Sequence, residues 1–326
     1  MTDTPTKVAD VIEPEVFNPY FREMTTRVNA FFTSGIVASV PDVSMGDSGG
    51  TQVQMPFWNA LGERAQLLDD NSNLVIKKIT SDQDTAVLHA RALVYGATDL
   101  SAALAGDDPM EAVAAGVAEN WSYELNMMLI STLKGAFASL LAESPDVNVL
   151  DISALSGTAS DIDGASFIDA AQLLGDHKDR IVGVLMHSAV EAHLAKNELI
   201  DYIRDSEGNL RMRTFMGKTV IVDDANVPSG TDYDTYLFGP GAIGWAEASP
   251  KVASETDRDP LIGGGQEYLV TRRHFVLHPR GVRWTPASGV PASTTPSDAE
   301  LETAGNWTRV YEKKNLRMVR LTHTVA

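Results

Sequence analysis

The sequence contains no cysteine among its 326 residues. This absence excludes a disulfide scaffold, a thiolate zinc site and cysteine catalysis, and it suits a protein made in a reducing cytoplasm. No apolar run reaches the length that a membrane-spanning helix needs, and the first ten residues, MTDTPTKVAD, lack the apolar region of a signal peptide. We therefore expect a protein without a membrane partner.

Positive charge is also scarce, since the chain has only 26 Lys and Arg residues but 44 Asp and Glu residues, which gives a net charge of −18 at pH 7. A protein that binds nucleic acid tightly through its phosphates needs a basic surface, so we expect no tight DNA or RNA binding. Two interpretations of the acidic surface stay open. It can simply favour solubility, or it can belong to a container wall that touches DNA without holding it.

The most regular pattern predicts a spine helix over residues 108–142. Asp108 can cap the first free amide groups, Pro109 suits the first helical position, and Glu111 completes a capping box. Pro145 stops the helix. Apolar or small residues recur three or four apart and predict one continuous stripe, at Val113, Val117, Trp121, Leu125, Met128, Thr132, Ala136 and Leu140.

Before this helix, residues 1–50 predict an arm that holds one amphipathic helix, from about residue 18 to residue 32, between proline- and glycine-rich flanks. A single short helix cannot bury its own apolar face, so it must dock elsewhere. Residues 51–96 change to a period of two, which predicts strands. The apolar runs 73–80 and 85–96 flank the turn-like sequence SDQD, and they predict a long projecting hairpin.

After Pro145 the pattern predicts a compact mixed domain over residues 151–261. Helices are predicted at 166–175 and from Ser188 onward, with apolar strands between and after them. Residues 267–284 predict a long strand, which a linker rich in Pro, Ser and Thr separates from a last alternating strand. The predicted fold class is α+β.

One glycine-rich segment, Gly239 to Gly244, matches the G-x-G-x-x-G pattern of dinucleotide sites. Such a site needs a helix to begin at the last glycine, whereas Pro250 follows too closely for one here. We interpret the segment as a turn between two strands. A soluble nucleotide-binding α/β enzyme remains the remote alternative, and nucleotide-dependent thermal stabilisation would support it.

Other candidate chemistry is weaker. His187, Glu191 and His193 do not follow the H-E-x-x-H order of zinc sites, and His274 with His278 on one strand face lacks a third ligand nearby. We interpret these histidines as surface or partner-contact residues. Neither a G-x-S-x-G elbow nor a phosphate-binding P-loop is present. The acidic pairs at 69–70, 107–108 and 223–224 fit turns and caps, with calcium at a subunit contact as the alternative. We predict no catalytic, cofactor-binding or metal-binding residue.

Basic residues gather in two clusters, and we expect them to pair with the acidic surface of a neighbouring subunit. On this hypothesis, reversing the charge of Arg317 and Arg320 blocks assembly. The clusters are Arg272, Arg273, Arg280 and Arg283, followed by Arg309, Lys313, Lys314, Arg317 and Arg320.

The order of arm, projecting loop, spine helix, compact lobe and return strands resembles that of the major capsid protein of tailed bacteriophages, which has the HK97-like fold. Sequence segments that resemble those of one phage coat-protein family occur along nearly the whole chain. They are VIEPEVFNPY, TQVQMPFWN, DLSAALAGDDPM, IDAAQLLGD, VLMHSAVEAHL, GKTVIVDD, YLFGPGAIGWAE, ETDRD and RRHFVLHPRGVRW. The resemblance implies an N-terminal arm (1–50), an extended loop (51–96), a peripheral domain with the spine helix (97–150), an axial domain (151–261), and return strands to the peripheral domain with a C-terminal extension (262–326).

The resemblance also implies a structural protein and no enzyme. It would assemble in the host cytoplasm as homo-hexamers and homo-pentamers into the icosahedral capsid of a virion around double-stranded DNA, which it would touch weakly and without specificity. Implied partners are a portal and a decoration protein. Too few residues precede the arm for the scaffolding segment of some members, so we expect a separate scaffolding protein or a cleaved segment. Lys77 and Lys78 lie in the loop, but no matching asparagine context is present in ETDRDPLIGGGQEY, so we expect no cross-link. An encapsulin-type nanocompartment, with protein cargo and no DNA, is the alternative.

Overall fold

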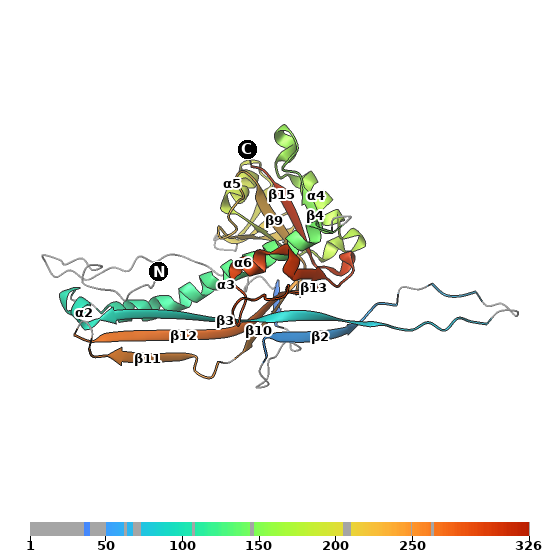
Figure 1. Ribbon diagram of the computed structural model, residues 1–326. Helices are drawn as coiled ribbons and strands as arrows, with labels where there is room; N and C mark the ends of the chain where they lie inside the picture. The colour runs from blue at the N-terminus through green and yellow to red at the C-terminus, as the bar shows by residue number, and fades with distance from the viewer. Residues whose placement is uncertain are drawn as a thin grey trace.

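A computed structural model describes residues 36–39, 50–61, 64–67, 73–105, 108–143, 147–204, 210–248, 250–261 and 264–325. The chain forms an elongated sheet, a compact lobe that stands on one part of it, and a thin projection that extends beyond it (Figure 1). One long helix follows the elongated sheet and ends under the compact lobe. None of the helices in the described ranges combines the length and the apolar character that a membrane crossing requires.

The elongated sheet has the strand order β1-β10-β12-β3-β2, and β11 pairs with β12 beside β10. Its strands are β1 (Val37–Ser39), β2 (Gln52–Trp58), β3 (Ser81–Thr98), β10 (Ile243–Ala248), β11 (Ser254–Asp259) and β12 (Gln266–Pro279). The two long strands β3 and β12 are antiparallel, from Thr98 opposite Gln266 to Leu88 opposite Val276. This long ladder gives the molecule its length.

Helix α3 (Pro109–Leu141) is the predicted spine helix, and both of its ends lie within one residue of the prediction. It follows the short α2 (Asp99–Ala105). Asp108 caps it by accepting a hydrogen bond from the Met110 backbone N at 2.9 Å, one residue earlier than the predicted capping box requires. Its first half lies on the elongated sheet, where Trp121 Nε1 donates to Thr271 Oγ1 of β12 at 3.1 Å.

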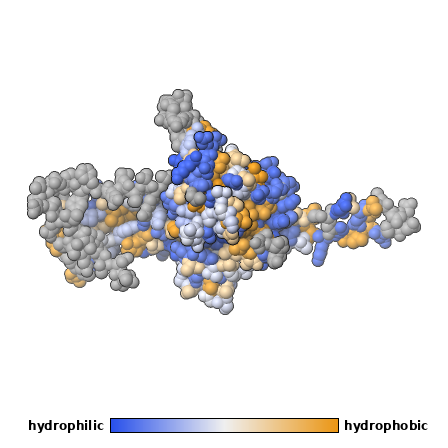
Figure 2. All heavy atoms as spheres, turned by 90° about the horizontal axis from the view of Figure 1, so that it is seen from above, coloured by the Kyte–Doolittle hydropathy of each residue, from blue (hydrophilic) through white to orange (hydrophobic). Residues whose placement is uncertain are grey.

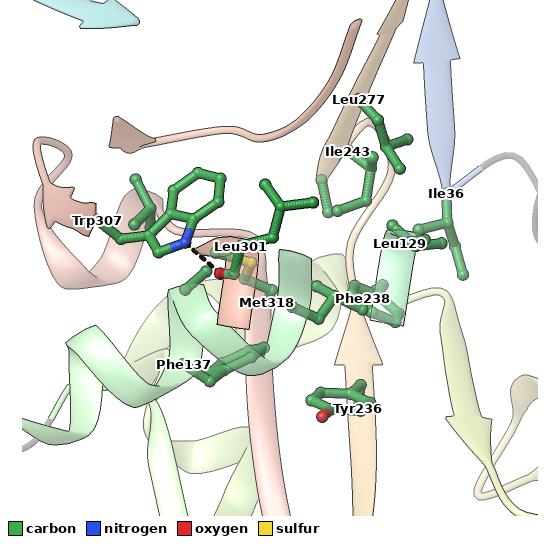
Figure 3. Packing of buried hydrophobic residues seen from close by; sticks show 14 of the residues in the cluster. Ile36, Leu129, Phe137, Tyr236, Phe238, Ile243, Leu277, Leu301, Trp307 and Met318 are labelled. Atoms are coloured by element: carbon green, nitrogen blue, oxygen red, sulfur yellow. Dashed lines mark hydrogen bonds between the residues drawn. The ribbon is translucent and has the colours of Figure 1, made fainter. Parts of the chain in front are cut away.

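The second half of α3 is enclosed on all sides, since no residue from Leu125 to Leu140 is exposed. The prediction of one apolar stripe is therefore wrong for this half. The elongated sheet covers one side, the compact lobe another, and a C-terminal segment a third (Figure 3). That segment comprises β13 (Val282–Trp284), α6 (Asp298–Glu302), the 3₁₀ turn η5 (Ala304–Asn306) and β14 (Trp307–Arg309). A helix that is apolar all round is one that the fold buries all round.

The compact lobe is a sheet of order β4-β15-β9-β5-β8-β7-β6 with helices α4 (Gly164–Gln172) and α5 (Ser188–Lys196). Its strands are β4 (Val149–Asp151), β5 (Gly183–Met186), β6 (Ile200–Arg204), β7 (Leu210–Phe215), β8 (Lys218–Val222), β9 (Tyr233–Phe238) and β15 (Met318–His323). Alternate residues of β9 face opposite ways. Tyr236 and Phe238 pack toward α3, whereas Leu237 packs with Phe167 of α4 and Val190 of α5. Burial on both faces explains the continuous apolar runs in β5 and at the end of β9.

The predicted hairpin between 73–80 and 85–96 is wrong, because residues 73–80 form no strand and β3 has a different partner. Strand β3 pairs with β2, from Val87 opposite Gln52 to Ser81 opposite Trp58. The sequence SDQD is the start of β3 and not a turn. Ser81, Asp82 and Gln83 are exposed strand residues, whereas Asp84 is buried in an ion pair with His278, which no local pattern reveals.

The strand pairing also differs from the predicted domain order in two places. Strand β15 lies between β4 and β9 in the compact lobe, although residues 262–326 were expected to return to the domain of the spine helix. Strands β10 and β11 belong to the elongated sheet, although 151–261 was expected to form one domain. Strand periodicity shows which residues face a core but not which sheet a strand joins. The predicted helix at 18–32 lies outside the described residues.

Candidate assembly surfaces

Residues 59–61, 64–67 and 73–80 form two chain segments that leave the body where β2 ends and β3 begins, and we call these described residues the projection. Asn59 N donates to Thr80 O at 2.9 Å, and further out Gln66 exchanges two hydrogen bonds with the backbone of Val75. Its apolar side chains are left in solvent: Leu61, Leu67 and Ile76 are 81%, 92% and 97% exposed. Figure 2 shows hydrophobic residues exposed on this projection beside hydrophilic ones. Apolar exposure of this extent marks an interaction surface.

A buried ion pair fixes the root of the projection. Asp84 of β3 accepts a hydrogen bond from His278 Nε2 of β12 at 2.9 Å and another from the Gly281 backbone N at 2.9 Å. Burial alone raises the pKa of Asp84, but His278 and the hydrogen bonds from Gly281 and Thr85 outweigh it, so that the pKa lies below its ordinary value. The interpretation of His278 as a surface or partner-contact residue was wrong.

Beside this root lies a cavity of about 530 Å³, which we call the arginine cavity. Arg180, Arg280 and Arg317 line it, together with Phe57 and Trp58 at the end of β2 and Tyr311 after β14. The rings of Phe57 and Tyr311 meet edge to face at 4.9 Å between centroids. Four segments far apart in sequence contribute to this cavity, so sequence patterns could not reveal it.

The opposite end of the elongated sheet is acidic. We call it the acidic end, and it comprises the start of α3, the end of β11 with residues 260 and 261, and the start of β12. Met110, Asp257 and Glu267 line one depression there, with Arg258 among them. Arg258 is bound to Asp99 and Glu267, which leaves the carboxylates of Asp257 and Asp259 without a cation within 4.0 Å among the described residues. Leu261, two residues after the end of β11, is 90% exposed.

The glycine-rich segment connects the two sheets. Strand β9 ends at Phe238 in the compact lobe, and β10 begins at Ile243 in the elongated sheet, where it pairs with β12. Gly241 has a φ of 64°, which suits glycine in a tight turn. A strand and not a helix follows the turn, so the prediction of a turn between two strands is confirmed.

The remaining histidine and acidic candidates have structural contacts. His187 Nδ1 accepts a hydrogen bond from Ala189 N at 3.0 Å and caps α5, while the His193 ring contacts Asn197 at the other end of that helix. The Ser188 backbone N donates to Asp224 at 2.9 Å, and hydrogen bonding from the Ser188 side chain, followed by that from its backbone, lowers the pKa of this carboxyl group. In the described part of the chain, no three His, Asp or Glu side chains are grouped as a metal site would require. Residues 69, 70 and 107 lie outside the described residues.

Most of the basic clusters are engaged within the chain, so the prediction that they pair with a neighbour is wrong for those residues. The intrachain pairs are Arg272 with Glu255, Arg283 with Asp82, Arg309 with Glu143, Lys314 with Asp176, and Arg320 with Asp234. Arg320 also lies over the Phe137 ring and is only 12% exposed, so reversing its charge would damage the fold itself. Of the two clusters, Arg280 and Arg317 line the arginine cavity instead.

Comparisons with known proteins agree on one family and one fold. Residues 23–316 match the family described as Gp13-like, major capsid protein 13-like. The major capsid protein of Bacillus phage SPP1 is 42% identical over 327 residues, which cover 98% of each chain. The solved capsid of cyanophage Pam1 has a similar fold, with a TM-score of 0.61, 11% identity and full coverage of both chains. The capsid of Ralstonia phage GP4 gives a TM-score of 0.60 at 9% identity, covering 100% and 99% of the two chains. The predicted α+β, HK97-like fold is confirmed.

Proposed function

The chain belongs to the major capsid protein 13-like family, and we propose that it forms rings of five and six copies that close into an icosahedral shell around double-stranded phage DNA. It is a structural component of the virion capsid. The predicted function as a major capsid protein is thereby confirmed, in preference to the encapsulin and enzyme alternatives.

One observation supports the assembly mechanism most directly: the projection holds apolar side chains far from any core of its own chain. Leu67 and Ile76 are almost fully exposed, and the backbone around them has few partners beyond the opposite segment. Burying one such side chain stabilises a contact by about 1.5–3 kcal/mol. The projection therefore lies on the elongated sheet of a neighbouring copy, where repeated copies multiply this contact.

We assign each strand to a domain according to the sheet that it joins. In this proposal the compact lobe, with β4 and β15 included, is the axial domain that meets its copies around the five-fold and six-fold axes. The elongated sheet and α3 form the peripheral domain between these axes. The arm, residues 1–50, enters the elongated sheet through β1, which pairs in parallel with β10 from Val37 opposite Ile243. Residues 1–35 and 40–49 of the arm lie outside the described residues.

The partners follow from this role. A separate scaffolding protein guides assembly in the host cytoplasm, a portal occupies one vertex, and a decoration protein binds the outer surface. Packaged DNA contacts the wall weakly, since a net charge of −18 repels phosphate. The chain works without catalysis, cofactor or metal, and the projection carries no cross-link through Lys77 or Lys78.

Electron microscopy of particles purified from infected cells tests this function. Icosahedral shells that contain this chain and double-stranded DNA support it, and boiling them in detergent should release a single monomer band. Shells filled with protein cargo and free of DNA would favour a nanocompartment, whereas a chain found only as a monomer would refute the assembly function.

A further inference from the structure

The arginine cavity carries an unusual excess of positive charge. Its wall holds Arg180, Arg280 and Arg317 against a single carboxylate, that of Glu312. No carboxylate of the described residues lies within 4.0 Å of any of the three guanidinium groups; Arg317 donates instead to the Pro240 carbonyl at 2.9 Å. On a chain with a net charge of −18, three arginines that line one cavity without an ion-pair partner among the described residues can attract an acidic ligand.

The same cavity offers apolar surface. Phe57 and Tyr311 pack edge to face, and the Trp58 side chain beside them is 68% exposed. Large aromatic surfaces flanked by arginine are the composition found at the centres of protein interfaces. A ligand that fills this cavity must therefore present both carboxylates and an aliphatic side chain.

We propose that the arginine cavity receives the end of β11 from a second copy of this chain. There β11 presents Asp257 and Asp259 without cation partners among the described residues, and two residues after the strand Leu261 is 90% exposed. These carboxylates are opposite in charge to the three arginines, and the aliphatic side chain of Leu261 suits the aromatic surface. A nucleic acid would satisfy the arginines with its phosphates, but it has no aliphatic group for the aromatic surface.

The placement of the two surfaces fits repeated association. The cavity lies at the root of the projection and the acidic end at the other end of β12, so the elongated sheet separates them (Figure 1). A contact between opposite ends of identical chains is heterologous, and it leaves one free surface of each kind on every pair for the next copy. Such a contact adds copies in one direction and specifies their order. It rests on the assembly function proposed above.

Charge reversal and exchange in the full-length chain test this contact. The variants are Arg180→Glu, Asp257→Arg and the double variant, because both side chains are exposed and neither holds the fold together. Lys251→Glu, an exposed cation midway along the elongated sheet, is the control for charge. Sedimentation and electron microscopy measure the protein concentration at which half of the chain is assembled, and thermal unfolding of the unassembled fraction confirms that each variant is folded.

We expect each single reversal to raise this half-assembly concentration by about tenfold, since a close interfacial charge pair becomes a like-charge pair. The double variant should return to within about threefold of wild type, because the exchanged charges attract again. Leu261→Asn should weaken assembly without lowering the unfolding temperature.

Three outcomes would contradict the contact. Single reversals that assemble like the control would overturn it, and so would a double variant whose defects merely add. A loss of binding to a short DNA duplex in Arg180→Glu, with assembly intact, would assign the cavity to a polyanion instead. If the wild-type chain never assembles, both the assembly function and this contact are wrong. If the wild-type chain assembles and the reversals behave like the control, only this contact is wrong.

Discussion

Asp84 and His278 form an ion pair 2.9 Å long between β3 and β12, and each side chain is only 2% exposed. The pair lies where β3 leaves the body toward the projection, and the second oxygen of Asp84 accepts from the Gly281 backbone N. It therefore connects the root of the projection to the β12–β13 turn. The direction in which the projection leaves the body depends on it.

Removing this carboxylate should destabilise the subunit strongly. We expect Asp84→Asn to lower the free energy of unfolding by about 3 kcal/mol, because one member of a buried pair is left without its partner charge. Urea unfolding of the unassembled chain measures this change. The control, Asp257→Asn, removes an exposed carboxylate and should stay within about 0.5 kcal/mol of wild type. Equal effects of the two substitutions would show that the pair contributes nothing.

The stability should depend on pH through Asp84 as well. Its pKa is lowered in the fold, so its stabilising contribution is present above the ordinary pKa of about 3.9 and is lost as the pH falls through the lower folded value. Unfolding measured between pH 5 and pH 2 should show a steeper loss of stability in wild type than in Asp84→Asn. Parallel curves would contradict this assignment.

A second histidine should act in a different pH range. Burial, and then the positive charge of Arg91, lower the pKa of His89 to about 3. Its unfolded form binds a proton near pH 6.5, so stability is complete above that pH and falls by a few kcal/mol as the pH drops toward 3. His89→Leu should flatten the curve in this range. Stability of wild type that is constant from pH 6.5 to pH 4 would contradict the prediction.

Gly135 of α3 leaves no room for a side chain. A Cβ atom there would overlap the Leu301 carbonyl oxygen of α6 and would lie 2.7 Å from Trp307 Nε1, which donates to that same carbonyl. Close packing of α3 against α6 and Trp307 therefore requires glycine at this position.

We expect Gly135→Ala to lower the free energy of unfolding by about 2–3 kcal/mol, despite the better helix propensity of alanine, because a backbone carbonyl cannot move aside as a side chain can. Thermal or urea unfolding measures this change. Gly305→Ala, where nothing lies within 4 Å of the added carbon, should be neutral. A neutral or stabilising Gly135→Ala would contradict the close approach.

Polar substitution on the projection should separate assembly from folding. Ile76→Ser removes a side chain that is almost fully exposed in the subunit, so the unfolding temperature should not change. Assembly should require about a tenfold higher protein concentration, because the contact loses the burial of one aliphatic group. Asn73→Ser, a polar change on the same segment, is the control. Wild-type assembly of Ile76→Ser would indicate that this part of the projection stays in solvent.

Local signals predicted the helices well. The spine helix begins at an Asp-Pro pair and ends before Pro145, and these signals depend only on neighbours in sequence. The helix at 166–175 was predicted within a few residues for the same reason, since Asp163 and Ser166 form a capping box in the structure. The sequence did not show that the second half of α3 would be covered on every side, because the covering elements come from three distant segments.

Strand partners and paired charges were harder to predict. The sequence SDQD looks like a turn because nothing local reveals that His278 neutralises Asp84 almost two hundred residues later. Arg320 looks like a surface cation because its position over Phe137 depends on β15 joining the compact lobe. Both errors concern polar groups that only tertiary structure satisfies.

The position of β15 sets the time at which the subunit can become complete during synthesis. Its residues, Met318–His323, form an inner strand of the compact lobe between β4 and β9. A ribosome must therefore make the chain past residue 323 before β4, synthesised some 170 residues earlier, gains its partner. Until then the lobe has a gap in its sheet. A prematurely terminated chain thus lacks the finished surface that its neighbours would recognise, and shells are assembled from subunits whose translation has passed this strand.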